Sequence, residues 1–132
     1  PDYIVKPPSA SEFMQNLVRR DVFFQFATSY LDSRSQTIKA TYGDDLQKFV
    51  SSYMISDEMM QEFRTFAKTK GMTIDDKDLQ KDIVYVKARI KAEIASVFWG
   101  NSGRYRVILE VDPQFQKAMV LIPEAVKFAK LN

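Results

Sequence analysis

The sequence predicts a mainly α-helical domain, an irregular bundle of several helices arranged around one long central helix. Three observations lead to this prediction. Apolar residues recur at helical spacing along most of the chain, several such segments begin with a serine or aspartate suited to a helix N-cap, and one segment keeps an apolar face over residues 76–98. The 132 residues, 45% of them hydrophobic, suffice for a single folded domain, which we place at residues 9–132.

The chain begins with a connector and two predicted helices. Residues 1–8 contain a short apolar run stopped by two prolines, which lack N–H donors, so we expect a strand end and a stiff linker there. Ser9 or Ser11 can cap a first helix that ends near residue 20. Asp21 can cap a second helix, whose many aromatic residues predict that it is buried.

The middle of the chain holds the best-defined predicted helix. Residues 32–45 are polar and carry turn chemistry, which predicts a helix end or a loop. A serine before two acidic residues at one end, and Gly71 after two lysines at the other, bracket a helix over residues 57–70. The apolar runs on either side of it, residues 53–55 and 72–74, can pair as a tiny two-stranded ribbon.

The longest predicted helix covers residues 76–98 and is ended by Gly100. Its apolar positions stay on one face with a period near 3.6 residues. Residues 101–103 are expected to form a flexible turn, and the pattern of residues 104–111 fits a helix or a strand. An Asp-Pro pair beginning at residue 112 then starts a last amphipathic helical segment. The apolar positions of the long helix are Leu79, Ile83, Val86, Ile90, Ile94 and Val97.

The composition excludes several classes of function. The sequence has no histidine and no cysteine, so Ser-His-Asp or Cys-His catalysis, thiolate or imidazole zinc sites and disulfides are impossible within these residues. A net charge of +2, from 19 basic and 17 acidic residues, does not predict a polyanionic partner. The longest apolar runs are far short of the roughly 20 residues that span a bilayer, so no transmembrane segment is predicted.

A cluster of carboxylates raises the question of a metal site. Asp75, Asp76, Asp78 and Asp82 lie close together in the sequence, and calcium and magnesium favour oxygen ligands. However, the loop glycine and distal glutamate of an EF-hand are absent, and acidic residues are favoured at a helix N-terminus in any case. We therefore predict a helix start here, and neither a metal nor a cofactor.

Basic and aromatic residues alternate just after the long helix. Arg104 and Arg106 flank Tyr105 soon after Trp99, a mixture typical of surfaces that stack nucleic-acid bases. Only two cations are local, so counterion release would contribute little to such binding. We favour the alternative that both arginines bind helix C-terminal carbonyls while Tyr105 packs, and we predict no nucleic-acid partner.

A serine nucleophile is also not predicted. No G-x-S-x-G motif surrounds Ser102, and no histidine can act as its base. A serine–lysine pair would need a desolvated lysine. Lys87 and Lys91 are expected on the solvent side of the long helix, so we assign no catalytic residue to this chain.

A set of short segments resembles the C-terminal region of carboxyl-terminal processing peptidases, also called tail-specific proteases, of the Bacteroidetes type. The segments occur in the family's order over nearly the whole chain, and their ordered set carries the resemblance. The stretch of residues 71–76 is more compact than in many members of the family. The matching segments are Pro1–Val5, Phe23–Tyr30, Ile55–Glu58 with Phe63, Phe98–Val107 and Asp112–Ala118.

The resemblance implies that this chain is a non-catalytic part of a larger serine peptidase. In that family a PDZ-like domain captures protein substrates and a Ser–Lys dyad cleaves them, and the motifs of both lie before the segment that resembles residues 1–8. None of these motifs maps onto this sequence. The implied role is packing against the peptidase core, dimerisation or formation of a substrate chamber, in the periplasm or cell envelope. The absence of an initiator methionine before Pro1 agrees with a piece of a longer gene product.

Two functional hypotheses follow. In the first, the chain is an accessory domain whose candidate interface is the end of the long helix, with Phe98, Trp99, Arg104 and Tyr105. In the alternative, it is a free-standing helical adaptor that binds a peptide in a groove bordered by the methionines, four of which lie between residues 54 and 72. Core filling is the commoner role of such methionines.

Overall fold

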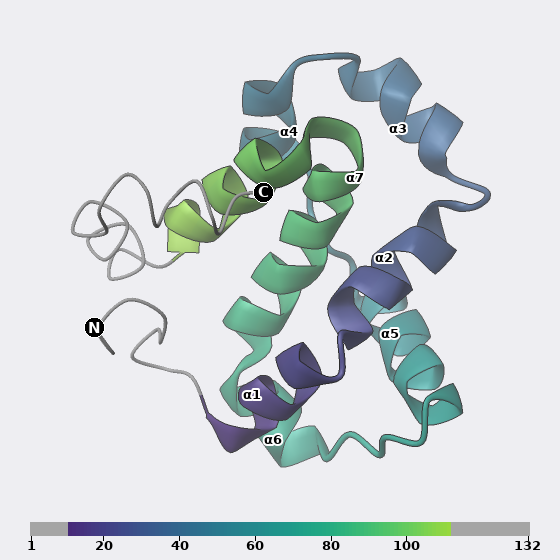
Figure 1. The fold of residues 1–132 in the computed structure, drawn as a ribbon, viewed down its shortest axis with the longest axis vertical. Coiled ribbons are helices and arrows are strands. Elements are labelled where there is room, and N and C mark those ends of the chain that lie inside the picture. Colours follow the sequence, from purple (N-terminus) through teal and green to yellow (C-terminus); the bar gives the residue numbers. More distant parts are fainter. Residues whose placement is uncertain (1–10, 112–132) are drawn as a thin grey trace.

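Seven helices and no strand make up the part of the chain that the computed structural model describes, residues 11–111 (Figure 1). The mainly α prediction, with one long helix, is confirmed. The linker predicted at residues 1–8 and the helix predicted from residue 112 lie outside the described residues. The helices are α1 (Glu12–Arg19), α2 (Val22–Leu31), α3 (Ser35–Tyr42), α4 (Leu46–Ser52), α5 (Asp57–Thr69), α6 (Asp76–Lys81) and α7 (Ile83–Val111).

Serine caps begin two of these helices as the sequence predicts. The Ser11 hydroxyl accepts a hydrogen bond from the Met14 N–H of α1, and the Ser56 hydroxyl accepts one from the Met59 N–H of α5. Gly71 has a φ of 81°, a left-handed conformation that favours glycine, just beyond the end of α5. The helix predicted over residues 57–70 is therefore confirmed to within one residue.

Two predictions for the second quarter of the chain need correction. Asp21 precedes α2 as expected, but its φ is 58° and its side chain makes no capping hydrogen bond. Residues 32–45 are not mainly loop, because they contain α3. This helix buries Ile38, and Tyr42 packs against Phe49 with ring centroids 5.3 Å apart, so two apolar contacts hold a segment that is otherwise polar.

The predicted ribbon between residues 53–55 and 72–74 is wrong. Neither run is a strand, because its backbone is used elsewhere. The Tyr53 N–H donates to the Phe49 carbonyl at the end of α4, and the Met72 N–H donates to the Ala67 carbonyl at the end of α5. The side chains of Ile55, Met72 and Ile74 instead enter the core from irregular connectors.

The long helix differs from its prediction at both ends. It is interrupted at Asp82, which separates α6 from α7 and has φ −109° and ψ 17°. The Asp82 carboxylate is buried and accepts a hydrogen bond of 2.5 Å from the Ser11 hydroxyl, which ties this junction to the start of α1.

Gly100 bends α7 rather than ending it. Its φ of 68° and ψ of −156° fall in a region essentially restricted to glycine. Helix resumes at once, so residues 101–103 are not a flexible turn, and residues 104–111 are helix and not strand. Figure 1 shows the two halves of α7 as a sharp bend. We call this bend the elbow, residues 83–99 its first arm and residues 101–111 its second arm.

Aromatic residues of α2 and α5 form the centre of the core, and α2 packs mainly against the first arm of α7. Phe23 stacks on Phe63 with ring centroids 5.4 Å apart, and Phe26 meets the edge of Phe63 at 5.3 Å. Such arrangements stabilise beyond the burial of area alone. Although α7 is long, no helix within residues 11–111 is apolar enough over its length to cross a membrane.

A second glycine lets the two arms approach each other. A Cβ atom at Gly103 would lie 2.9 Å from the Ala95 carbonyl oxygen and 3.0 Å from the Trp99 Cβ. The first of these contacts is with backbone, which cannot swing aside. The second arm therefore needs glycine at position 103 to lie where it does.

The substitution Gly103→Ala is expected to lower the free energy of unfolding by about 1–3 kcal/mol, because the added methyl group overpacks the elbow. Urea unfolding followed by circular dichroism measures the change. The matched control is Ser102→Ala, an exposed neighbour in the same helix, which should change stability by less than about 0.5 kcal/mol. Equal effects of the two substitutions would contradict the close approach.

The phenol of Tyr53 predicts a specific alkaline instability. Its pKa is raised well above the ordinary value of 10.0, first by burial and then by Tyr30 and Tyr42. The unfolded chain therefore loses this proton at a lower pH than the folded chain, so stability falls as the pH rises above about 10. Tyr53→Phe should lose less stability than the wild type between pH 9 and about 11, measured by urea unfolding at each pH. Parallel losses in both proteins would show that Tyr53 is not responsible.

Candidate functional site

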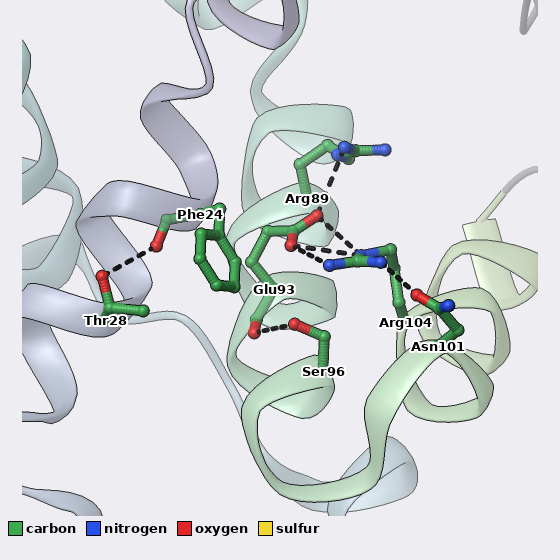
Figure 2. Close-up of polar contacts among 7 residues, drawn as sticks. All are labelled: Phe24, Thr28, Arg89, Glu93, Ser96, Asn101 and Arg104. Carbon is green, nitrogen blue, oxygen red and sulfur yellow. Dashed lines mark hydrogen bonds and ion pairs between the residues drawn. The ribbon is translucent and has the colours of Figure 1, made fainter. Parts of the chain in front are cut away.

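The elbow brings together the most extensive cluster of charged side chains that the described residues hold. Arg89 and Glu93 lie one turn apart on the first arm of α7, and Arg104 reaches them from the second arm. The Glu93 side chain is only 3% exposed, while those of Arg89 and Arg104 are 30% and 26% exposed. Figure 2 shows both guanidinium groups directed at the Glu93 carboxylate.

Hydrogen bonds fix the positions of these groups. The Nε of Arg104 lies 3.1 Å from both Glu93 oxygens, and its Nη2 lies 2.9 Å from Oε1. Arg89 approaches from the other side, with its Nη2 3.2 Å from Oε2. The Arg104 Nη1 also donates to Asn101 Oδ1, which anchors the guanidinium to the start of its own arm. The forked donors of arginine suit such carboxylate pairing.

The cluster carries an excess of positive charge. Two guanidinium groups share one carboxylate, so their formal charges sum to +1. Burial lowers the pKa of Arg89 from its ordinary value; Glu93 opposes this effect and the positive charge of Arg104 adds to it. The Nε of Arg89 is buried and has no hydrogen-bond partner within the described chain. The charge of Arg89 is therefore compensated only in part.

Apolar side chains flank this cluster. Phe24 of α2 is 38% exposed, and Figure 2 shows its ring pointing from α2 towards α7 beside Glu93. Val97 follows Glu93 by one helical turn and is 44% exposed. Both are among the few large apolar residues left exposed in residues 11–111, the others being Val18, Met54 and Val84.

The four residues predicted as an interface all lie at the elbow, and the structure shows internal contacts for several of them. The Trp99 ring packs on Phe49 with centroids 5.2 Å apart, and its Nε1 donates to the Asp44 carbonyl at 3.3 Å. Phe98 packs partly against the core, and Tyr105 is half-buried. Arg104 binds Glu93. Contact of these residues with a partner stays a prediction.

The arginines and Lys91 differ from their predicted roles. Arg104 and Arg106 do not bind helix C-terminal carbonyls, because Arg104 pairs with Glu93 and Arg106 donates to the Gln47 side-chain oxygen. Lys91 is not on the solvent side: its Nζ donates to the Val50 carbonyl of α4 at 2.7 Å. Burial lowers the pKa of Lys91, and the charge of Glu110 opposes this.

Sequence reasoning missed Glu93 and Arg89. Their spacing of four residues is a visible signal for an ion pair on a helix. Nothing in the sequence showed that Arg104, eleven positions later, would fold back onto them. That contact depends on the elbow at Gly100, which was expected to end the helix.

The acidic cluster near residue 75 serves a helix start, as predicted. The Asp75 carboxylate accepts hydrogen bonds from the N–H groups of Lys77 and Asp78, and Asp76 pairs with Arg64 at 2.5 Å. Asp82 bonds Ser11 instead. Across residues 11–111, no group of three or more acidic side chains is placed to hold a metal ion.

The methionines between residues 54 and 72 do not border a groove. Met59, Met60 and Met72 are buried in the core, and only Met54 is exposed. Core filling therefore accounts for three of the four. Two open hollows occur elsewhere, one of about 590 Å³ lined mainly by α1 and the α6–α7 junction, and one of about 260 Å³ beside the end of α5.

The substitution Glu93→Gln is expected to lower the free energy of unfolding by about 2 kcal/mol or more, because it leaves two partly buried guanidinium groups without a counter-charge. Chemical denaturation measures it. The matched control is Glu62→Gln, which removes an exposed pair with Arg34 at 3.4 Å and should cost less than about 1 kcal/mol. A cost for Glu93→Gln no larger than that of the control would refute the structural role of the carboxylate.

Comparison with known proteins gives one match. Residues 13–100 match the model of a family described as a family of unknown function, DUF8443. The matched range includes α1 except its first residue, α2 to α6, the first arm of α7 and Gly100. No curated protein and no solved structure matches the sequence.

Proposed function

The chain belongs to DUF8443, a family of unknown function, and we propose that it is a non-catalytic helical accessory domain that docks onto other protein surfaces. More specifically, we propose that it forms the C-terminal part of a carboxyl-terminal processing serine peptidase of the bacterial periplasm or envelope. There it would pack against the peptidase core, support a dimer or line the substrate chamber. Cleavage would be carried out by a Ser–Lys dyad in the preceding part of the same polypeptide.

The observation that carries the docking role is the construction of the elbow. Its charged residues are engaged with one another: both Glu93 oxygens accept from arginine, and Arg104 is also bonded to Asn101. Groups held in this way position two helical arms and do not present a free acid or base to a substrate. Beside them, Phe24 and Val97 remain exposed, as apolar residues at protein contacts often are.

The assignment to a processing peptidase is supported by the ordered segments of sequence that resemble that family. Three of them lie wholly in the described part of the chain: Phe23–Tyr30 in α2, Ile55–Glu58 at the start of α5, and Phe98–Val107 across the elbow. The last of these contains both Gly100 and Gly103. The elbow therefore lies within one of the segments that carry the resemblance.

The alternative, a free-standing adaptor that binds peptides in a methionine-bordered groove, has less support. Three of the methionines that would form the groove are buried in the core. We therefore retain this adaptor only as the outcome that the following experiment would favour if the proposal fails.

The first experiment is to sequence the gene upstream of the Pro1 codon. We expect an uninterrupted reading frame that encodes a PDZ-like segment and a peptidase core with serine and lysine in the family's order. In the protein purified from that whole gene, deletion of residues 9–132 should change the oligomeric state measured by light scattering or lower the melting temperature. Translation that starts at Pro1 would contradict the proposal and favour the adaptor.

A further inference from the structure

We propose that Phe24, Arg89, Val97 and Arg104 form a binding face for an acidic side chain and a neighbouring apolar side chain of a protein partner. We call these four residues the α2/α7 face. The inference rests on the proposed docking role and makes it more specific, because it identifies the surface and the chemistry of the contact. It does not depend on the partner being a peptidase core.

The charge of the cluster is complementary to an acidic side chain. The cluster of Arg89, Glu93 and Arg104 has a formal charge of +1, and Glu93 already binds both arginines, so a second carboxylate would balance the site. Arg89 forms one ion pair in the described part of the chain, through Nη2, and Figure 2 shows another of its guanidinium nitrogens pointing away from Glu93. The Arg89 side chain is 30% exposed, so a partner can approach it from solvent.

The charge of Arg89 is compensated only in part, and its Nε is buried without a hydrogen-bond partner in the described part of the chain. A buried donor without a hydrogen bond is uncommon in folded proteins, and burial of a charge is unfavourable unless it is paired. A carboxylate at the exposed edge of Arg89 would add the missing counter-charge, although it would not reach Nε itself. Asp21, the other acidic residue whose charge acts on Arg89, contributes less than Glu93.

The apolar residues define the rest of the face. Val97 lies one helical turn beyond Glu93, and Phe24 points towards α7 beside the same residue. Exposed apolar area next to a partly desolvated arginine is the composition found at the centres of protein interfaces, where arginine and aromatic residues are enriched. A partner with an acidic and an apolar side chain next to each other fits both parts.

The surroundings favour a protein partner over other ligands. The two open hollows are lined by residues of α1, α5 and the connectors around α6, and neither includes a residue of the α2/α7 face. Neither of these two hollows therefore offers a small molecule an enclosed site at the α2/α7 face. One excess positive charge is also too little to hold a nucleic acid, which requires several phosphate contacts.

The test uses the whole chain and two small probes. The first is the dipeptide N-acetyl-Leu-Glu-amide, in which the glutamate side chain is the only carboxylate. The matched probe is N-acetyl-Leu-Gln-amide. Two-dimensional NMR follows the arginine Nε–H signals and the Val97 methyl signals while each probe is added at constant ionic strength. We expect saturable shifts of the Arg89, Arg104 and Val97 signals with the glutamate probe at millimolar concentration, and at least about tenfold weaker binding of the glutamine probe.

Variants distinguish the two parts of the face. Arg89→Gln should weaken the glutamate probe about tenfold, and Val97→Ser should weaken it by a smaller factor. Met54→Ser, at an exposed apolar position on another part of the chain, should leave binding unchanged. Circular dichroism melting of each variant shows that it is folded, and Arg89→Met, which also removes the charge, serves if Arg89→Gln does not fold.

Three results would overturn the inference: equal binding of the two probes, an unchanged affinity in folded Arg89→Gln or Arg89→Met, or loss of binding in Met54→Ser. These outcomes are separate from failure of the proposed function. If the upstream gene encodes no peptidase core but the glutamate probe binds as expected, the α2/α7 face stands and the peptidase assignment falls. If the core is present but the probe does not bind, the reverse holds.

Discussion

Burial of the Glu93 carboxylate is the constraint on which the arrangement of α7 depends. A carboxylate in the interior is tolerated only if cations and hydrogen bonds compensate it. Arg89 comes from the same arm, but the closest hydrogen bonds come from Arg104, so the second arm must fold back. Two glycines permit this. Gly100 adopts a backbone conformation that other residues rarely adopt. Gly103 has no Cβ atom, so the two arms can approach each other closely.

Local signals predicted much of the fold. The serine caps of α1 and α5, the glycine after α5 and the 3.6-residue apolar period are effects of neighbouring residues, so the sequence displays them directly. The prediction of a two-stranded ribbon was wrong because the backbone N–H groups of Tyr53 and Met72 donate to carbonyls at the ends of α4 and α5. The elbow was missed because a glycine that ends a helix and one that bends it look alike in a sequence, and burial of the following arm decides between them.

The candidate site was predicted only in part, because only contacts between residues close in the sequence have local signals. Phe98, Trp99, Arg104 and Tyr105 were placed together because they are close in sequence, and all four do lie at the elbow. Their partners come from distant segments: Trp99 meets Phe49 and the Asp44 carbonyl, and Arg104 meets Glu93. Such pairings depend on tertiary packing. The exposed side chains of Phe24 and Val97 belong to two different helices, α2 and α7. The sequence pattern of neither helix predicts that these two residues stay exposed.

The backbone conformation of Gly100 also sets where the far end of the second arm lies. The second arm extends about 15 Å from this residue, at about 1.5 Å per residue, so a rotation of about 10° at its backbone displaces Val111 by about 3 Å. The bend itself lies in the backbone of Gly100, and the Glu93–Arg104 ion pair joins the two arms close to it. The position of Val111 relative to the first arm is therefore set by the backbone conformation of one residue, Gly100.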